Sequence, residues 1–235
     1  MKPRLICAVF IALLVAQPPH ALAADRSRPV WRWSFEYDSI GKPPPRFQFA
    51  RTGGGQTGLW LVLMEQGSMT QRRVLAQVDP EVAEHRLAIA VADEPILGDV
   101  QVRVRCKLVA GTTSQSCGVV ARYQDPSTYY VAEADALLGT IRLDAIVAGE
   151  RRPLAAKRML VPTGVWHGLR LDAAGDQLDV YWNSGKVLEA RDATLAQPGR
   201  AGVWIQSDAR TYFDELTIQG LDRPARERRR SDGQR

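Results

Sequence analysis

Few of the residues that build metal or nucleophile sites occur in this chain. It has three cysteines and three histidines, and beyond the N-terminal segment only His85 and His167 remain, with no ligand cluster beside them. No Gly-x-Ser-x-Gly elbow is present, and the glycine triplet at 53–55 follows no strand-to-helix phosphate pattern. These absences argue against zinc, serine-hydrolase and nucleotide-binding chemistry.

No apolar run is long enough to cross a bilayer, which needs about 20 such residues. The run near the start extends from Leu5 to Ala16, follows Lys2 and Arg4, and precedes a small-residue stretch ending at Ala23. This order is typical of a secretory signal peptide, here residues 1–23. A retained anchor is the alternative, and the short run disfavours it. We expect a periplasmic or secreted protein that does not insert into a membrane after signal removal.

Excess positive charge lies mainly at the two ends of the chain. Of the formal net charge of +5, Lys2 and Arg4 belong to the signal, and residues 221–235 hold six arginines against three acids. The expected domain, residues 24–220, is close to neutral, so no nucleic-acid partner is expected. The tail at 221–235 is interpreted as a basic disordered end, with a nucleic-acid arm as the less favoured alternative.

Helical periodicity is scarce, whereas apolar and polar residues alternate with period two along most of the mature chain. Strand pairs are expected at 129–135 with 140–147, at 166–171 with 177–182, and at 201–206 with 211–219, and a further strand is expected near Val187. So many strands with so few helices favour an all-β fold: a two-sheet antiparallel β-sandwich of the jelly-roll type.

A hairpin is predicted from Asp99 to about residue 123. With Cys106 opposite Cys117, Val104 pairs with Val119, so that apolar residues share one face. The same register places Arg122 beside Gln101 on the outer face. A disulfide fits this geometry and an oxidising compartment, and two buried free thiols fit the pattern as well.

Several of these segments resemble the concanavalin A-like lectin/glucanase superfamily. They lie at 117–125, 129–131, 141–143, 164–170, 199–204 and 212–216. Their order is most similar to laminin-G-like domains and to the 3-keto-disaccharide hydrolase-like domains of exported bacterial proteins. The resemblance implies a concanavalin A-like jelly roll with glycan contact on the concave face, and it implies no particular reaction, because one fold hosts many functions.

Paired carboxylates are the first candidates for catalysis. Glu133 and Asp135 lie on one strand face, within the separation that glycoside hydrolysis requires, and Asp144 follows on the next strand. Laminarinase-like members of the superfamily carry Glu-x-Asp-x-x-Glu, whereas the last position here is Leu138. The competing interpretation is a pair of solvated acids on a strand.

A polar and aromatic face is the candidate for sugar binding, because guanidinium groups donate directional hydrogen bonds to hydroxyls and aromatic rings stack on sugar C–H faces. Its predicted ligand-binding residues are Arg103, Arg122, Tyr129, Arg142 and Trp204. A set of cross-strand salt bridges partly covered by aromatics explains the same residues.

Asp214 shares the parity of the apolar residues Leu216 and Ile218, so its carboxylate needs a hydrogen bond, a cation or a proton. One interpretation is a structural Ca²⁺ held with backbone oxygens of residues 36–38, as in related sandwiches. The favoured one is a carboxylate capped by turn amides after a bulge, because one acid rarely makes a calcium site.

Three functions follow from these observations. The first is an exported carbohydrate-binding domain that recognises a glycan or sugar derivative on its concave face. The alternatives are a glycoside or 3-keto-glycoside hydrolase on the same fold, and a structural or interaction domain without catalysis. The sequence does not fix the sugar or the oligomeric state.

Overall fold

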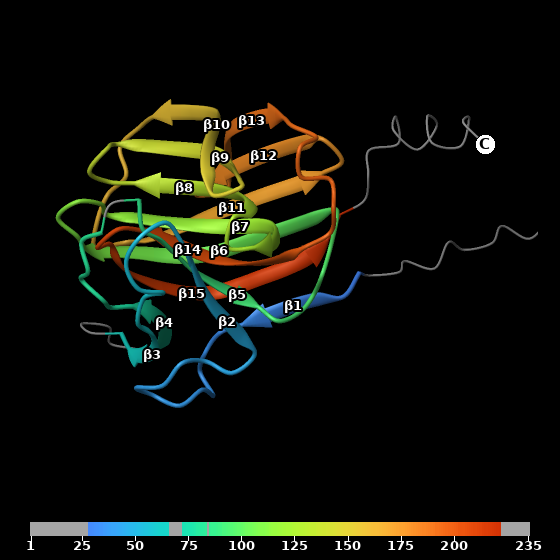
Figure 1. The fold of residues 1–235 in the computed structure, drawn as a ribbon. Coiled ribbons are helices and arrows are strands. Elements are labelled where there is room, and N and C mark those ends of the chain that lie inside the picture. Colours follow the sequence, from blue (N-terminus) through green and yellow to red (C-terminus); the bar gives the residue numbers. More distant parts are fainter. Residues whose placement is uncertain (1–27, 66–71, 84, 222–235) are drawn as a thin grey trace, which may run out of the picture.

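The structure is a computed structural model that describes residues 28–65, 72–83 and 85–221. Within these ranges the chain forms fifteen β-strands, arranged as two antiparallel sheets packed face to face (Figure 1). The expected all-β, two-sheet sandwich is therefore confirmed. The described residues contain no helix long and apolar enough to span a membrane. The expected signal peptide at 1–23 and all but the first residue of the expected tail lie outside the described residues, and both stay predictions.

The eight-stranded sheet runs in the order β13-β12-β11-β6-β15-β4-β3, and β1 pairs with β15. Its strands are β1 (Val30–Trp33), β3 (Trp60–Met64), β4 (Arg73–Gln77), β6 (Val100–Ala110), β11 (Trp166–Ala174), β12 (Gln177–Trp182), β13 (Gly185–Arg191) and β15 (Arg210–Gly220).

The seven-stranded sheet runs in the order β10-β9-β8-β7-β14-β5-β2. Its strands are β2 (Phe47–Thr52), β5 (Leu87–Ala92), β7 (Ser116–Asp125), β8 (Thr128–Asp135), β9 (Thr140–Val147), β10 (Glu150–Arg158) and β14 (Arg200–Gln206).

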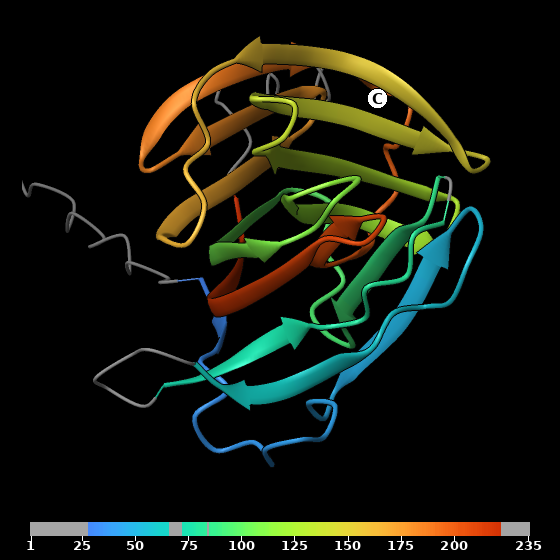
Figure 2. The same ribbon diagram turned by 90° about the vertical axis from the view of Figure 1, so that its left-hand side faces the viewer.

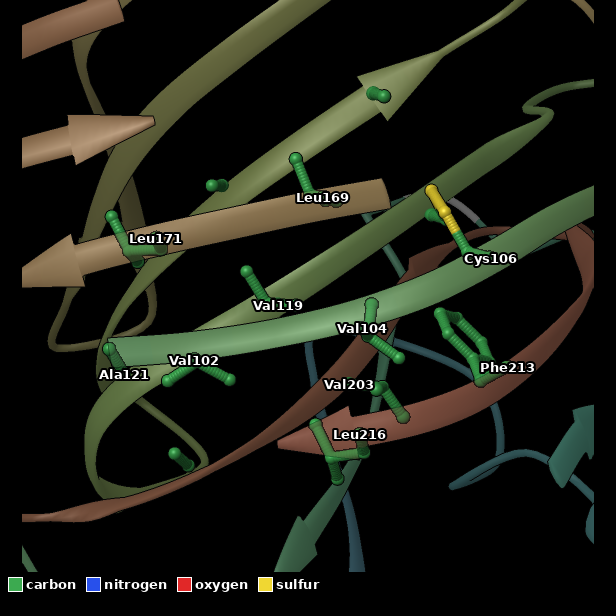
Figure 3. Packing of buried hydrophobic residues seen from close by; sticks show 14 of the residues in the cluster. Val102, Val104, Cys106, Val119, Ala121, Leu169, Leu171, Val203, Phe213 and Leu216 are labelled. Carbon is green, nitrogen blue, oxygen red and sulfur yellow. A yellow bond between two sulfur atoms is a disulfide. The ribbon is translucent and has the colours of Figure 1, made fainter. Parts of the chain in front are cut away.

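The main core lies between the sheets and follows the alternation of the sequence. Val102, Val104 and Cys106 on β6 are fully buried, and the intervening Arg103 and Arg105 lie on the outer face. Figure 3 shows this row beside Leu169 of β11 and the side chains of the facing sheet. Each fully buried aliphatic side chain contributes about 1.5–3 kcal/mol to folding. Burial of every second residue along these strands therefore supplies much of the free energy that holds the two sheets together.

The predicted hairpin between residues 99 and 123 is wrong, because β6 and β7 belong to different sheets. The strands face each other across the core, and a Cys106–Cys117 disulfide joins them, with the Cα atoms 6.4 Å apart (Figure 3). The predicted pairing of residues 201–206 with 211–219 fails in the same way: both strands exist, as β14 and β15, in opposite sheets. The same alternate residues are buried whether two strands pair within one sheet or face each other across the core, so alternation does not distinguish the two arrangements.

Two other hairpins match the expectation: β8 pairs with β9, and β11 pairs with β12. The turn after β12 also lies where it was predicted, with positive φ at Asn183 and Ser184, and it leads into β13. At the start of the chain, β1 ends at Trp33. Phe35 is buried beyond it, and Tyr37 is 98% exposed, so the alternating aromatic residues Trp31, Trp33, Phe35 and Tyr37 do not form one continuous strand face.

The seven-stranded sheet curls strongly toward its outer side. Thr52 Oγ1 on β2 lies 2.8 Å from the Tyr129 hydroxyl on β8, although β5, β14 and β7 lie between these strands. In a flat sheet such strands would be roughly 19 Å apart. The outer side is therefore concave, and we call it the concave face.

A second apolar cluster fills much of the concave face. It includes Trp204, Tyr129, Val131 and Ile146, all fully buried. Burial raises the pKa of Tyr129 to about 12, so its hydroxyl stays protonated and donates to Thr52, whose own hydroxyl donates to the Pro126 carbonyl. The concave face is thus largely closed.

Candidate functional site

Arg151 of β10 is the centre of a polar cluster on the concave face. Its Nε donates to Asp144 Oδ2 at 2.7 Å, and its Nη1 donates to Gln206 Oε1 at 2.8 Å. Its Nη2 contacts Glu133 Oε2 and lies 2.5 Å from Asp144 Oδ2. We call Arg151, Glu133, Asp144, Gln206 and Trp204 the Arg151 cluster.

Strand register brings these residues together. On the adjacent strands β8 and β9, Glu133 lies opposite Arg142, and Asp144 is two residues further along the same face. Arg151 lies opposite Ile146 on edge strand β10, so its long side chain reaches diagonally over both acids. A guanidinium suits this position because its five N–H donors form a planar fork that matches carboxylates.

Trp204 of β14 supports the guanidinium from one side, with the Arg151 Cζ 5.6 Å from the ring centroid. The indole fits because its neighbour in β7 is Gly118: a Cβ there would lie 2.8 Å from Trp204 Cε3. Such a contact is too close, so any larger residue would displace the ring. Gly118 therefore makes room for the platform on which Arg151 rests.

The charges of the cluster are balanced but strongly desolvated. Glu133 and Asp144 are both fully buried, and Arg151 and Arg142 are the cations beside them. Burial raises the pKa of Glu133, and the attraction of Arg151 opposes this rise without cancelling it. Glu133 Oε1 and Asp144 Oδ1 have no hydrogen-bond partner among the described residues. Each is an acceptor that the surrounding chain leaves unused.

A pocket of about 460 Å³ opens beside the cluster. Arg151 and Gln206 contribute cluster side chains to its lining, Glu150 is the first residue of β10, and His85 lies on the segment before β5. This volume lies within the range of small-molecule sites. The lining combines a cation, an acid, an amide and an imidazole, which together offer hydrogen-bond donors and acceptors to a ligand.

The structure brings five of the predicted site residues together: Glu133, Asp144, Arg142, Tyr129 and Trp204 all lie on the concave face. It does not leave them equally accessible, because only the Arg142 side chain is partly exposed, at 25%. Their predicted catalytic and ligand-binding roles stay predictions.

Asp135 is buried at the end of β8 and holds a turn. Its Oδ2 accepts a hydrogen bond from Ser114 Oγ at 2.8 Å, and its Oδ1 accepts one from the Leu138 amide at 2.9 Å. Neither Asp135 nor Glu133 is solvated, contrary to the interpretation of two exposed acids. A catalytic role for Asp135 stays a prediction.

Arg122 does not lie beside Gln101, so its predicted position is wrong. It has a φ of 50° at an irregularity of β7, which turns the side chain toward the edge of the sandwich. There it donates to the carbonyls of Gly98 at 2.7 Å, Leu195 at 2.9 Å and Gly175 at 2.8 Å. These bonds tie three loops together, and a ligand-binding role for Arg122 stays a prediction.

Arg103 lies on the outer face of the other sheet, on β6, and is exposed. The two sheets therefore separate it from the Arg151 cluster. Asp214 is buried at a bulge of β15, where Oδ1 accepts the Glu215 amide at 2.7 Å and Oδ2 lies 3.4 Å from Arg72 Nη1.

These contacts already engage both oxygens of Asp214, and an arginine is an unfavourable neighbour for a cation. No group of three or more metal-ligating side chains gathers anywhere in the part of the chain that the structure describes. The bulge and its amide match the capped carboxylate, and the Ca²⁺ site stays a prediction.

Sequence reasoning missed Arg151, although it found both of its acids. The residue follows the turn at Ala148 and Gly149, and it lies in a strand whose opening sequence Glu-Arg-Arg-Pro lacks apolar alternation. The polar start of an edge strand gives no periodic signal, and the apolar residues of β10 are the consecutive Leu154, Ala155 and Ala156, which do not alternate with polar ones. The one usable signal was chemical: two buried carboxylates on adjacent strands need a cation.

No family model matches the sequence, and no curated protein matches it. Solved structures do resemble it. The carbohydrate-binding module CBM66 from Bacillus subtilis has a TM-score of 0.57 and 16% identity, over 69% of this chain and 92% of that one. A Bacillus subtilis protein of unknown function with a galectin-like fold has a TM-score of 0.56 and 12% identity, over 83% of this chain and 96% of that one.

The GH43 protein BlXynB from Bacillus licheniformis is also similar, with a TM-score of 0.55 and 17% identity over 81% of this chain. The match covers 39% of that protein, so this chain corresponds to part of its length. Identities this low show the fold alone. The chain is an all-β, galectin-like sandwich of two antiparallel sheets, in agreement with the concanavalin A-like fold expected from the sequence.

Proposed function

We propose that this protein is an exported carbohydrate-binding domain whose pocket beside the Arg151 cluster holds the end of a neutral glycan. The observation that carries the proposal is the state of Arg151: its guanidinium is fixed by Glu133, Asp144 and Gln206 while it lines a pocket of about 460 Å³. A donor fixed before binding loses little entropy when a ligand hydroxyl arrives.

The chemistry of the pocket favours hydrogen bonding over stacking. Tyr129 and Trp204 are both fully buried, so neither ring face is available to a sugar. The groups that reach the pocket are those of Arg151, Gln206, Glu150 and His85. Recognition by polar groups in a pocket without exposed aromatic rings suits a terminal residue with several free hydroxyls better than a flat chain laid over aromatics.

Export is supported by two independent features. The Cys106–Cys117 disulfide is of the kind that persists in oxidising compartments, and the first 23 residues have the pattern of a secretory signal. Carbohydrate binding, in turn, is supported by a similar solved structure, which is a carbohydrate-binding module.

The hydrolase alternative depends on the pair of Glu133 and Asp144. Both carboxylates contact Arg151 Nη2, and burial raises the pKa of Glu133, as a general acid would require. Both are fully buried beneath the guanidinium, however, and a general acid must reach the glycosidic oxygen. The geometry therefore favours binding over cleavage.

The test is calorimetric titration of the mature protein with a panel of neutral mono- and oligosaccharides. Glu150→Ala removes an exposed lining group, and Arg151→Lys keeps the charge but loses the planar fork. Each is expected to weaken binding by roughly tenfold or more, as hydrogen bonds to charged groups usually do. The matched control is Lys157→Ala, an exposed residue of the same strand that does not line the pocket.

Unchanged affinity in both pocket variants, or no binding of any neutral sugar by the wild type, would refute the proposed site. Release of sugar from a chromogenic glycoside by the wild type, abolished in Glu133→Gln, would instead establish the hydrolase alternative.

A further inference from the structure

A row of basic residues crosses the outer face of the eight-stranded sheet, on the side of the molecule opposite the Arg151 cluster. In strand register, Arg32 of β1 lies opposite Thr217 of β15, and Thr217 lies opposite Arg103 of β6. Arg103 in turn lies opposite Arg170 of β11. We call Arg32, Arg103 and Arg170 the basic row.

The members of the basic row differ in how they are neutralised. Arg170 forms an ion pair with Asp172 at 3.1 Å, and its Cζ lies 3.5 Å from the centroid of the Tyr181 ring. Arg32 and Arg103 are exposed and form no ion pair or side-chain hydrogen bond with any described residue. Two guanidinium groups are therefore left free for a ligand. They are roughly 10 Å apart, because one strand, β15, lies between the strands that carry them.

Direct opposition of two arginines is unfavourable in a sheet. Arg103 and Arg170 occupy a directly opposed pair of β6 and β11, where like charges destabilise the pairing. Arg103 itself forms no ion pair with any described residue: Asp172 pairs with Arg170, and Glu215, which lines the same hollow, pairs with Arg105 at 3.3 Å and with Arg72 at 3.7 Å. An anion bound at Arg103 would remove the repulsion.

The surface beside the row is hollowed and lined with polar groups. A pocket of about 480 Å³ contains both Arg32 and Arg103 in its lining, together with Thr217, Gln101, Gln219, Ser34, Trp33 and Glu215. The one carboxylate of this lining, Glu215, pairs with Arg105 and Arg72, so it leaves the charges of Arg32 and Arg103 unbalanced. The amide of Gln219 donates to the side-chain oxygen of Gln101 at 3.1 Å, and the Gln101 amide donates to Asp172, which leaves one of its two hydrogens for a ligand. The hollow therefore offers cations for an anion and neutral polar groups for hydroxyls.

We propose that this face binds an acidic polysaccharide whose rings carry carboxylates, a polyuronate, with the chain lying across the strands. The guanidinium fork matches a carboxylate with two parallel hydrogen bonds, so Arg32 and Arg103 hold carboxylates of different rings. Thr217 lies between them, Gln101 lies two residues from Arg103 on β6, and both take the intervening hydroxyls. This site is separate from the pocket beside the Arg151 cluster.

Two other polyanions fit this face less well. Single-stranded nucleic acid needs exposed rings for base stacking, but the guanidinium of Arg170 already covers Tyr181, and Trp33 packs edge-on against Phe47 at 5.7 Å between centroids. A lipid surface needs apolar side chains to insert, and the residues that line the hollow are polar apart from Trp33.

The experiment is a titration of the mature full-length chain with polygalacturonate oligomers at low and high salt. The double variant Arg32→Gln/Arg103→Gln is expected to weaken binding by roughly tenfold or more, and added salt is expected to weaken wild-type binding. Because the repulsion between Arg103 and Arg170 is removed, Arg103→Gln alone is expected to raise the melting temperature by about 1–3 °C, which also confirms folding.

Three controls separate the basic row from other sources of binding. Arg152→Gln removes an exposed arginine from the other sheet. A variant with Arg226, Arg228, Arg229 and Arg230 changed to Gln neutralises the C-terminal segment, and Arg151→Lys alters the pocket proposed for neutral glycans. All three are expected to bind polygalacturonate as the wild type does.

Binding that survives the double variant, or that disappears when the C-terminal arginines are changed, would overturn the proposal. So would a single-stranded oligonucleotide that binds as tightly as the polyuronate with the same dependence on Arg32 and Arg103. Loss of neutral-sugar binding in Arg151→Lys leaves this proposal untouched, so the two sites succeed or fail separately.

Discussion

Arg151 and Arg103 have the same side chain in opposite surroundings. Arg151 contacts two fully buried carboxylates, whereas Arg103 is exposed and faces another arginine. Removing one partner from a buried ion pair usually costs 3–5 kcal/mol, whereas removing the charge of Arg103 is expected to stabilise the fold slightly. The charge of Arg151 therefore stabilises the folded state, whereas the charge of Arg103 slightly destabilises it. An unfavourable exposed charge is the stronger sign of function.

Glu133 gives the cluster a pH dependence with a definite sign. Burial raises its pKa above the ordinary value of 4.5, so in the window above 4.5 the folded protein binds more protons than the unfolded chain. The contribution of this group to stability therefore falls as the pH rises through that window. Glu133→Gln cannot lose a proton there, so the stability of the variant relative to the wild type is expected to rise with pH. Urea unfolding at a series of pH values measures this difference.

Asp208 provides a control of opposite sign. Burial alone would raise its pKa, but hydrogen bonds from the Thr112 hydroxyl and the amides of residues 112–114 lower it. Its stabilising contribution is present above the ordinary value of 3.8 and is lost as the pH falls through the lowered pKa. Asp208→Asn is therefore expected to lose stability relative to the wild type as the pH rises. The same trend in Glu133→Gln would contradict the account of the buried acid.

At the scale of the strands, the disulfide between β6 and β7 links the two sheets. It closes a loop of 11 residues in sequence separation, and a crosslink over a loop of about this length stabilises a fold by about 3 kcal/mol. Changing both Cys106 and Cys117 to Ala is expected to lower the free energy of unfolding by about 2–4 kcal/mol in urea denaturation. Free thiols in the denatured, unreduced wild type would show that the bond does not form.

Alternation along β6 correctly predicted its buried row, and alternation along β8, β9, β11 and β12 predicted two hairpins. It could not predict the partner of β6. Apolar rows meet apolar rows whether two strands are neighbours in one sheet or face each other across a sandwich. The cysteine pair fits both arrangements. Which strand pairs with β6 therefore depends on the loops and the remaining strands, and the sequence between residues 99 and 123 carries no information about them.

The candidate site was predictable only in part for a similar reason. Glu133 and Asp144 were candidates as catalytic carboxylates and Trp204 as part of the polar and aromatic face, and all three lie together on the concave face. Alternation failed for Arg122, because the positive φ at a β-bulge turns that side chain from the face that alternation assigns. Alternation also failed to predict that these residues are buried. The curl that brings Thr52 to Tyr129 is a property of the whole sheet, and it covers side chains on the concave face that a flat sheet would leave exposed.

At the scale of the molecule, the two sheets present different outer faces. The concave face of the seven-stranded sheet is largely closed by its apolar cluster and carries the Arg151 pocket, whereas the outer face of the eight-stranded sheet carries the basic row. Figure 2 shows the strands of both sheets in a second view, and the main core of buried side chains lies between the two sheets. A ligand on one face therefore makes no contact with a ligand on the other.

This separation predicts that the two proposed sites bind independently. Sites that share no contacts usually behave additively, and the rigid disulfide-linked core between them offers no alternative packing that one ligand would favour. Titrating a neutral sugar into protein saturated with polygalacturonate is therefore expected to give the same affinity as titrating it into free protein. Arg103→Gln is expected to leave that affinity unchanged, and Arg151→Lys is expected to reduce it under both conditions. A neutral sugar that displaces the polyuronate would place both ligands on one face, and the assignment of two separate surfaces would then be wrong.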